Sequence, residues 1–425
     1  MNLFDVFGAE ILADELPPTE IIKNEMEEEY KRKQMKVVRS FHPVGQGAFY
    51  SERFYKGEKR ELAYNVVYDC GTSWGTLWKA KKVIKQAFDK NDSIDYLFIS
   101  HLDYDHVSLV ETLIDSVKCV KNIVLPLVAK EEWTLATNLN RIGGHDDAVR
   151  FLERFYNPNA SDDGSQNRSK NDFTTYIVRN DEENYVISGA NIWNDGDAKT
   201  LDRDWDWVLI PRNMKVSERR RQLVKSLDKL FEKEHVLKEI QEAAQQQITT
   251  GRELLEKLED RDFVGRVMRN AGLRKAIKGA YEKVAGGTNE NSLLLYSGPK
   301  STDTNYWMRV DSLPWVKRPF LRRYRAGCLY TGDSNCDINE WKGRLYPNVW
   351  GNIGTMQLPH HGSLGSFDMS KNDIDRFYFF PVSCGSTNPY GHPSGKVLAY
   401  LIANGCAPRI VTEMAGSVFM EVVED

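Results

Sequence analysis

Two histidines and two aspartates fall within six residues of the sequence Ser100-His-Leu-Asp-Tyr-Asp-His-Val107. The apolar run Ile94-Asp-Tyr-Leu-Phe-Ile99 leads directly into this motif and is typical of a strand buried on both faces. A strand end is a rigid platform, and the turn after it allows the four polar side chains to converge. Imidazole nitrogen and carboxylate oxygen together suit zinc, manganese or iron. The motif therefore predicts a metal site whose ligands are His101, Asp103, Asp105 and His106.

Three further loops carry the same kinds of side chain. Four ligands on one loop cannot enclose two ions, so a two-metal site needs more His and Asp residues at other strand ends. The sequence supplies them in Leu329-Tyr-Thr-Gly-Asp333, Gln357-Leu-Pro-His-His-Gly-Ser363 and Asn388-Pro-Tyr-Gly-His-Pro393. A single strand-end Asp is more often a helix cap, and a single His more often a satisfied polar group. Five of the eight histidines lie in these motifs, however, which favours one shared site.

Strand-like and helical patterns alternate before about residue 122 and again after about residue 292, which predicts an α/β fold. Between them, residues 133–284 change character and end in a charged helical stretch, so we expect a large, mainly helical insertion there. Residues 1–34 end in a charged run typical of a solvated helical extension. One apolar stripe marks the helical stretch: a helix packed on its own domain is the simpler interpretation, and a partner or self-association face is the alternative. The stripe comprises Leu223, Leu227, Leu230, Leu237 and Ile240.

The composition is that of a globular chain. Of 425 residues, 41% are hydrophobic and 28% are charged, which is enough apolar material for one large domain or two ordinary ones. The net charge of −4 excludes a protein that coats nucleic acid with its whole surface, although it allows a local basic groove. We expect a cytoplasmic protein without a membrane segment, because no run approaches the roughly 18–20 apolar residues that a bilayer requires. The six cysteines lack CxxC spacing and predict no cysteine metal site.

The His-x-Asp-x-Asp-His run resembles the signature of the metallo-β-lactamase fold, in the variant with Asp in place of the second His. The ordered motifs look most like the hydrolase domain of the ComEC competence proteins, over residues 35–122 and from about residue 288 to the end. Three features differ from those proteins. Their membrane channel is absent, residues 133–284 have no counterpart in them, and Ala48 stands where an acidic residue usually follows Gly-Gln-Gly. The matching motifs are Val44-Gly-Gln-Gly47, Asn289-Glu-Asn-Ser-Leu293, Thr331-Gly-Asp333, Pro359-His-His-Gly-Ser363, Tyr390-Gly-His-Pro393 and Val411-Thr-Glu-Met-Ala-Gly416.

The resemblance implies an αββα sandwich over residues 35–425, with two divalent ions, zinc or manganese, at one edge of its two sheets. Each ion would have its own ligands, and Asp333 would bridge them. Asp69 would orient the metal loop, and His360 would fix the imidazole of His361. His145 is a weaker candidate for the first ion. The implied ligands are His101, Asp103 and Asp333 for the first ion, and Asp105, His106, His361 and Asp333 for the second.

Such a site would activate water for hydrolysis. Asp105 could receive the proton of the water. His392 could contact a phosphate or protonate the leaving oxygen, or it could only shape its Gly-His-Pro turn. Asn291 and Ser292 could bind phosphate or hold the neighbouring loop, and the residues alone favour neither role.

We therefore expect a nuclease or phosphodiesterase acting on nucleic acid or another phosphodiester. The segment Trp315–Arg325, which includes Arg322 and Arg323, interleaves five basic residues with aromatic ones, as in grooves that track phosphates and stack bases. A solvated basic loop with its aromatic residues facing the core is the alternative interpretation. A hydrolase of a small ester, thioester or cyclic nucleotide is the second functional hypothesis, since one fold serves many chemistries. A non-catalytic, metal-stabilised module that recruits a partner through the helical insertion is the third.

Overall fold

The computed structural model describes most of the chain beyond its first 33 residues. The predicted N-terminal extension therefore lies outside the described residues, except for Gln34. Asn291 and most of the basic segment also lie outside them. The described residues are 34–73, 77–127, 133, 136–137, 140–141, 145–156, 173–179, 190–213, 219–258, 260–281, 292–301, 306–310, 322–335, 337–367, 369, 374 and 379–424.

Ten strands form one mixed sheet in the order β14-β13-β19-β1-β2-β3-β5-β7-β8-β9. Neighbours from β14 to β3 are antiparallel, whereas β3, β5, β7, β8 and β9 run parallel. Parallel neighbours need crossover connections, and those from β3 to β5 and from β5 to β7 are long enough to hold helices, as expected for α/β patterns. The strands are β1 (Met35–Phe41), β2 (Phe49–Lys56), β3 (Glu61–Cys70), β5 (Tyr96–Phe98), β7 (Asn122–Pro126), β8 (Thr174–Arg179), β9 (Asn191–Asn194), β13 (Tyr306–Val310), β14 (Arg322–Tyr324) and β19 (Phe419–Glu424).

Seven strands form a second sheet in the order β10-β11-β12-β15-β16-β17-β18. Its first four strands pair antiparallel, and β15 to β18 run parallel. Two short strands, β4 (Ser93–Ile94) and β6 (Cys119–Val120), pair separately. The strands of the second sheet are β10 (Lys199–Thr200), β11 (Trp207–Asn213), β12 (Leu293–Pro299), β15 (Gly327–Tyr330), β16 (Ile353–Met356), β17 (Phe379–Ser383) and β18 (Ala407–Val411).

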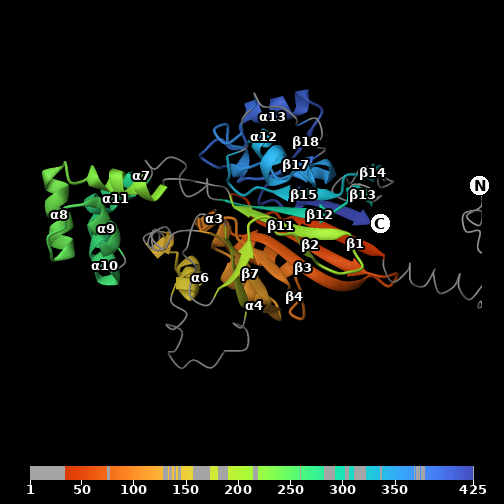
Figure 1. Cartoon of the computed structure of the whole chain (residues 1–425), viewed down its shortest axis with the longest axis horizontal. Coiled ribbons are helices and arrows are strands. Elements are labelled where there is room, and N and C mark those ends of the chain that lie inside the picture. The colour runs from red at the N-terminus through yellow and green to blue at the C-terminus, as the bar shows by residue number, and fades with distance from the viewer. Residues whose placement is uncertain are drawn as a thin grey trace, which may run out of the picture.

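Helices cover the outer faces of both sheets (Figure 1). Three hydrophobic clusters fill the spaces between the resulting layers. One joins helices to the ten-stranded sheet, one lies between the sheets, and one joins the second sheet to helices beyond it. Four layers of αββα type follow from these three cores, as the sequence predicts. The covering helices are α2 (Leu77–Ala87), α3 (Tyr104–Val107), α4 (Val110–Ser116), α6 (Asp146–Tyr156), α12 (Ile338–Glu340) and α13 (Gly395–Ala403).

The predicted helical insertion is narrower in the structure. Residues 174–179 and 191–213 lie inside the range 133–284, yet they contribute strands to both sheets and no helix. Pro211 of β11 obscures this pattern, because proline usually argues against a strand in the middle of a sheet. Proline is tolerated here because β10 pairs with β11 only at Leu209 and Val208. On the side of β11 that faces β10, no strand of the described residues pairs with Pro211. The helical part begins after Asn213.

Five consecutive helices between β11 and β12 form a body with its own hydrophobic core, which we call the helical body. It lies beside the sandwich, not within its layers (Figure 1). The predicted apolar stripe is divided between two helices, and Leu223, Leu227, Leu230 and Ile240 are all buried in this core. The stripe therefore packs within the body itself, as the simpler interpretation expects. The helices are α7 (Arg219–Asp228), α8 (Glu234–Ala244), α9 (Gly251–Lys257), α10 (Arg261–Arg269) and α11 (Ala271–Tyr281).

The described helices include none with the length and apolar character needed to cross a bilayer.

A buried charged cluster joins the two sheets of the sandwich. The Arg39 guanidinium donates from Nε to Glu52 at 2.6 Å and from a terminal nitrogen to Glu421 at 2.7 Å. All three side chains are at most 1% exposed. Tyr330 of the second sheet donates to Glu52 at 3.0 Å, and Thr355 donates to Glu421. Because each carboxylate has partners in both sheets, the cluster fixes how the sheets stack.

Candidate metal centre

Asp69 organises the loop that carries the His-x-Asp-x-Asp-His motif. It ends β3 with a positive φ of 56°, a conformation that is costly for a residue other than glycine and that marks functional sites. Its Oδ1 accepts a hydrogen bond from the Ser100 backbone N at 2.6 Å. Its Oδ2 accepts from Ser100 Oγ at 2.7 Å and lies 2.8 Å from His106 Nδ1. Asp69 therefore has the orienting position that the sequence resemblance implies.

The hydrogen bonds orient all three imidazoles in the same way. An ionised carboxylate and a backbone carbonyl can only accept, so His106 Nδ1 donates to Asp69 and His361 Nδ1 donates to the Ser383 carbonyl at 2.8 Å. The Ser100 hydroxyl proton is used on Asp69, so its oxygen accepts from His101 Nδ1 at 2.9 Å. Each ring therefore directs Nε2 into the centre, and Nε2 is the atom that binds a metal once it carries no proton.

Glycines allow the loops of the site to pack backbone against backbone. A Cβ atom on Gly71 would lie 2.5 Å from the Asp105 carbonyl, and one on Gly47 would lie 2.8 Å from it. Gly332, with φ +54°, would bring a Cβ within 2.7 Å of Ser100. Real Cβ atoms do not approach so closely, so glycine is required at these positions.

The second half of the centre comes from the other sheet. Asp333 follows β15, and its backbone N donates to Ser292 Oγ at 3.0 Å. Gln357 Oε1 accepts from the backbone N atoms of Thr331 and Gly332 at 2.9 and 3.1 Å. These bonds hold the Thr-Gly-Asp turn against the end of β16. The carboxylate of Asp333 therefore faces the His101–His106 loop across the edge of the two sheets.

Two groups of three ligand atoms lie close enough to hold metal ions. His101, His106 and Asp333 form the first, and Asp105, His106 and His361 form the second, each with its atoms within 4.8 Å of one another. His106 Nε2 is 3.2 Å from Asp333 Oδ1, and His361 Nε2 is 3.1 Å from Asp105 Oδ2. His106 belongs to both groups, whereas the sequence assigned it to one ion only.

The ligand atoms of the centre are better suited to binding a metal than to bonding one another. The Nε2 atoms of His101 and His106 are buried and make no hydrogen bond among the residues that the structure describes. A buried polar atom without a partner costs about 1–3 kcal/mol, a cost that a bound cation would offset. Asp103 occupies the N-cap position of α3, yet its side chain makes no capping bond. Its Oδ2 lies 3.9 Å from His101 Nε2, on the side of the first group.

Proton affinities in the centre are strongly coupled. Burial, with a smaller effect of His106, lowers the pKa of His101 to about 4. Burial would also lower the pKa of His106, but the nearby carboxylates of Asp333, Asp69 and Asp105 outweigh it and raise this pKa well above its usual value. Burial would raise the pKa of Asp333, but His106 and His361 outweigh it and hold this pKa well below its usual range. Ionised Asp333 and neutral His101 are ready-made ligands.

Asp333 has contacts on both sides of the centre. Its Oδ1 faces His106 and also lies 3.9 Å from His361 Nε2, whereas Oδ2 lies 3.9 Å from His101 Nε2. This placement suits the predicted role of a carboxylate shared between two ions.

His360 has a different neighbour from the one the sequence predicted. The expectation was that it would fix the imidazole of His361, but Ser383 does so. Both histidines have positive φ, 47° and 52°, and this backbone turns their rings apart, with centroids 6.2 Å from each other. His360 Nδ1 bonds Ser366 Oγ at 2.9 Å, and its Nε2 lies 3.8 Å from Asp333 Oδ2. His360 is thus a candidate ligand beside His101.

His145 does not reach the metal groups. Its ring stacks on Tyr104, with ring centroids 3.6 Å apart. The weaker expectation that it completes the first site is therefore wrong: the stack with Tyr104 uses the ring face for packing and leaves the ring outside both groups of ligand atoms.

Ser292 is fully buried, and its hydroxyl accepts from the Asp333 backbone and lies 3.4 Å from His101 Nδ1. It therefore holds the neighbouring loop, which is one of its two predicted roles. Asn291 lies outside the described residues.

Arg322 and Arg323 lie far from the metal centre, and their predicted contact with substrate stays a prediction. Strand β14 pairs with β13, and Trp307 of β13 pairs with Glu424 at the end of β19. The metal loops lie at the other end of β19, beyond Phe419, as Figure 1 also shows from the positions of α3 and β14. The cause of this distance is the pairing of the β13–β14 hairpin with β19, which the nearness of the arginines to Asp333 in sequence does not reveal.

Sequence reasoning missed the residues that orient the ligands. Ser100 bonds the adjacent His101, whereas Gln357 and Ser383 hold the turn of Asp333 and the ring of His361 from segments 25 and 22 residues away. Of these three residues, only Ser100 could have been found from the sequence, because it lies between a buried strand and the first histidine. Gln357 and the Ser383 carbonyl carry no sequence pattern that distinguishes them.

Replacing Asp69 with Asn should lower metal affinity by about 10- to 100-fold, as is usual when the partner of a ligating histidine is removed. The amide keeps the shape but places a donor beside His106 Nδ1, which also donates. Metal titration followed by protein-bound metal analysis measures the change. Asp95→Asn is the matched control, because Asp95 is also buried and accepts a backbone N–H, from Asn65, but belongs to neither ligand group. Equal metal affinity of Asp69→Asn and wild type would contradict the assigned role.

Comparison with known families supports this assignment. Residues 63–129, which carry Asp69 and the whole His-x-Asp-x-Asp-His loop, match the model of the metallo-beta-lactamase superfamily. No curated protein matches the chain. Members of the superfamily are mostly metal-dependent hydrolases and typically bind divalent metals. Residues 63–129 are therefore similar to the metallo-beta-lactamase superfamily, and the candidate metal ligands lie at one edge of the two sheets.

Proposed function

We propose that the protein is a metal-dependent nuclease or phosphodiesterase. The observation that carries the proposal is the pair of ligand groups that share His106, in which the buried Nε2 atoms of His101 and His106 make no hydrogen bond among the described residues. Two-metal sites of this kind are typical of enzymes that hydrolyse phosphate esters. The ordered motifs that resemble the ComEC hydrolase domain favour a phosphodiester over other substrates.

The residues of the chain would divide the work as follows. His101, Asp103 and Asp333 would hold one ion and Asp105, His106, His361 and Asp333 the other, either zinc or manganese. Bound metal would supply Lewis-acid activation of water and neutralise charge on the attacked phosphate. Burial would raise the pKa of Asp105, but His106 and His361 outweigh it and hold this pKa below its usual value, so Asp105 is ionised and would accept the proton of the water as a weaker base than an ordinary carboxylate.

His392 faces the centre from a separate loop. Its ring centroid is 5.8 Å from that of His360, and its turn is shaped by Asn388, which accepts from the His392 backbone N and donates to its carbonyl. The imidazole is therefore not needed to shape the turn. In this proposal it would contact the phosphate or protonate the leaving oxygen.

The decisive experiment is cleavage of labelled single- and double-stranded DNA and RNA by the full chain with manganese, zinc or magnesium. The Asp105→Ala/His106→Ala variant is the control, since it removes two ligands from one group. Metal-dependent cleavage by the wild type that is lost in the variant would support the proposal and identify the polymer. Hydrolysis of small esters or thioesters with no cleavage of any polymer or phosphodiester would contradict it.

Arg322 and Arg323 are proposed as distant contacts for a long polymer. Replacing both with Ala should weaken binding of a long nucleic acid and reduce the salt slope of its affinity by about two, one for each lost phosphate contact. Cleavage of oligonucleotides of about four residues should not change, because such substrates cannot extend from the metal loops to β14. Lys238→Ala/Arg252→Ala, on the exposed surface of the helical body, is the charge-matched control. Salt slopes that are the same in wild type and both variants would remove these arginines from the substrate path.

A further inference from the structure

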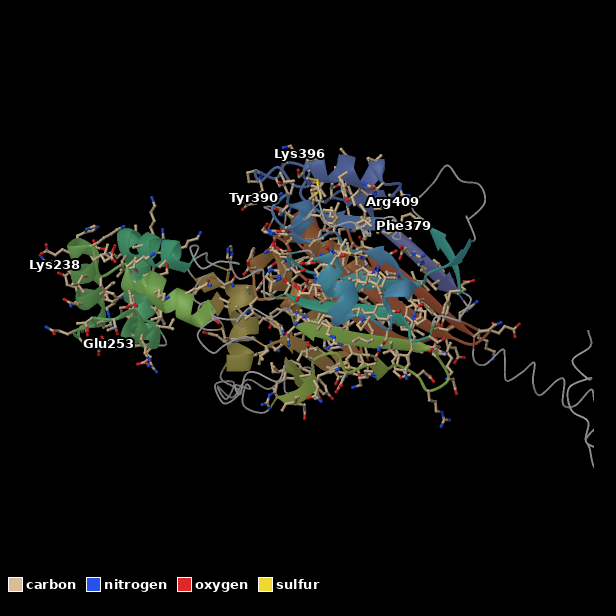
Figure 2. The ribbon with its side chains drawn as sticks, turned by 45° about the horizontal axis from the view of Figure 1, so that its top comes forward. Lys238, Glu253, Phe379, Tyr390, Lys396 and Arg409 are labelled. Atoms are coloured by element: carbon tan, nitrogen blue, oxygen red, sulfur yellow. The ribbon has the colours of Figure 1, made fainter. Side chains whose placement is uncertain are left out.

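Tyr390 is an exposed aromatic residue beside the metal centre. Its side chain is 68% exposed, although tyrosines usually bury most of their ring surface. It lies in the loop between β17 and α13, which begins just after Ser383, the partner of His361. Figure 2 shows it at the outer edge of the sandwich. A single exposed aromatic residue needs no explanation by itself, so its surroundings decide.

Three rings lead from Tyr390 into the centre. Tyr390 stacks on His392 with ring centroids 6.0 Å apart and planes inclined by only 19°. The ring of His392 is 5.8 Å from that of His360. His360 Nε2 in turn lies 3.8 Å from Asp333 Oδ2. The outer face of Tyr390 therefore lies two rings away from the carboxylate shared by the candidate ligands.

The loop that presents Tyr390 is held in place on two sides. The side chain of Asn388 donates to the carbonyls of Gly385 and His392 and accepts from the His392 backbone N. The Ser394 backbone N donates to the Gly362 carbonyl at 2.9 Å, which ties this loop to the one that carries His360 and His361. A rigid, exposed ring loses little entropy when a flat ligand stacks on it.

We propose that Tyr390 is the stacking platform for a nucleobase adjacent to the phosphate that is cleaved. The inference rests on the proposed phosphodiester substrate and names a residue that determines substrate specificity. Every nucleobase offers a flat π face, so a stacking contact favours nucleotides over simple phosphate esters without selecting a base. Tyr390 is too far along the ring series to act on the phosphate itself, so its effect is on binding and not on the chemical step.

The test compares short oligonucleotides with and without bases. Fluorescence anisotropy measures binding of the metal-loaded full chain to a labelled thymidylate tetramer with phosphorothioate links and to the same tetramer without bases. Tyr390→Ala should weaken binding of the base-containing tetramer by about 5- to 100-fold and leave the abasic tetramer unchanged. Tyr390→Phe should bind as the wild type does, because stacking needs the ring and not the hydroxyl. Ile192→Ala, at an exposed position on β9, is the control for loss of surface apolar area.

Each outcome is decisive. A preference for the base-containing tetramer that Tyr390→Ala removes and Tyr390→Phe keeps supports the platform. Equal binding of both tetramers by the wild type, no binding of either, or a preference that survives Tyr390→Ala overturns it. Cleavage is measured separately on the ordinary phosphodiester tetramer, where Tyr390→Ala should raise KM and leave kcat near the wild-type value. Base-dependent binding without any cleavage would keep the platform and reject the proposed nuclease activity.

Discussion

The Asp333→Ala variant is expected to lose roughly 1,000-fold or more of the hydrolytic activity, together with most of its bound metal. Asp333 is 3% exposed, and its two oxygens face His101, His106 and His361 from both sides of the centre. A metal contributes several kcal/mol of charge stabilisation to hydrolysis, and about 4 kcal/mol corresponds to a thousandfold change in rate. Removing the shared carboxylate affects both ligand groups at once.

Activity on a chromogenic phosphodiester and elemental analysis of the purified protein measure the two effects. Asp262→Ala is the matched control, because Asp262 is an exposed aspartate of the helical body and lies in no ligand group. Asp333→Asn separates shape from charge, since it keeps one oxygen but loses the negative charge. If Asp333→Ala keeps the metal content of the wild type and an activity within tenfold of it, Asp333 is not a metal ligand.

Replacing Arg39 with Met is expected to lower the free energy of unfolding by about 3–5 kcal/mol. The substitution leaves Glu52 and Glu421 as two buried carboxylates without their cation, and both are at most 1% exposed. Such a loss is a large part of the 5–15 kcal/mol that stabilises an ordinary protein. Thermal and urea unfolding of the sandwich, followed by tryptophan fluorescence, measure it.

The control for Arg39→Met removes the whole charged cluster. Arg39→Met/Glu52→Gln/Glu421→Gln leaves no buried charge among these three residues and should recover a large part of the lost stability, since uncompensated charge and not lost packing is the cause. A triple variant no more stable than Arg39→Met would show that the contacts of the guanidinium, including the one to the Ala326 carbonyl, matter more than its charge.

The sequence was most informative where chemistry is local. The buried strand before Ser100 and the dense His and Asp pattern after it predicted the metal loop, and the structure places His101, Asp105 and His106 in the two ligand groups. The sequence also assigned the distant loops of Asp333 and His361 to this site, because Asp and His residues recur there after strands. What a side chain contacts beyond that depends on backbone angles that no pattern records. His360 and His361 are adjacent in sequence, yet their rings point to different neighbours.

The sequence predicted the class of the fold but not which segments contribute strands to its sheets. An αββα arrangement followed from the motifs, whereas the strands β8 to β11 were hidden within a region expected to be helical. Their pairing partners are remote: β11 pairs with β12 only after the whole helical body has intervened. The distance of Arg322 and Arg323 from Asp333 could not be predicted for the same reason, because the position of the β13–β14 hairpin depends on its pairing with the C-terminal strand.

The way in which the helical body joins the sandwich has an evolutionary consequence. Asn213 and Leu293 are paired across β11 and β12, so residues 214–292 leave and re-enter the sheet at one place. The entropy of closing a loop grows only with the logarithm of its length, so a longer or shorter excursion costs the strand pairing little. This position is therefore a permissive insertion point, where lineages can enlarge, exchange or delete an accessory body. Ser292 is the limit to this freedom, because the turn of Asp333 depends on it.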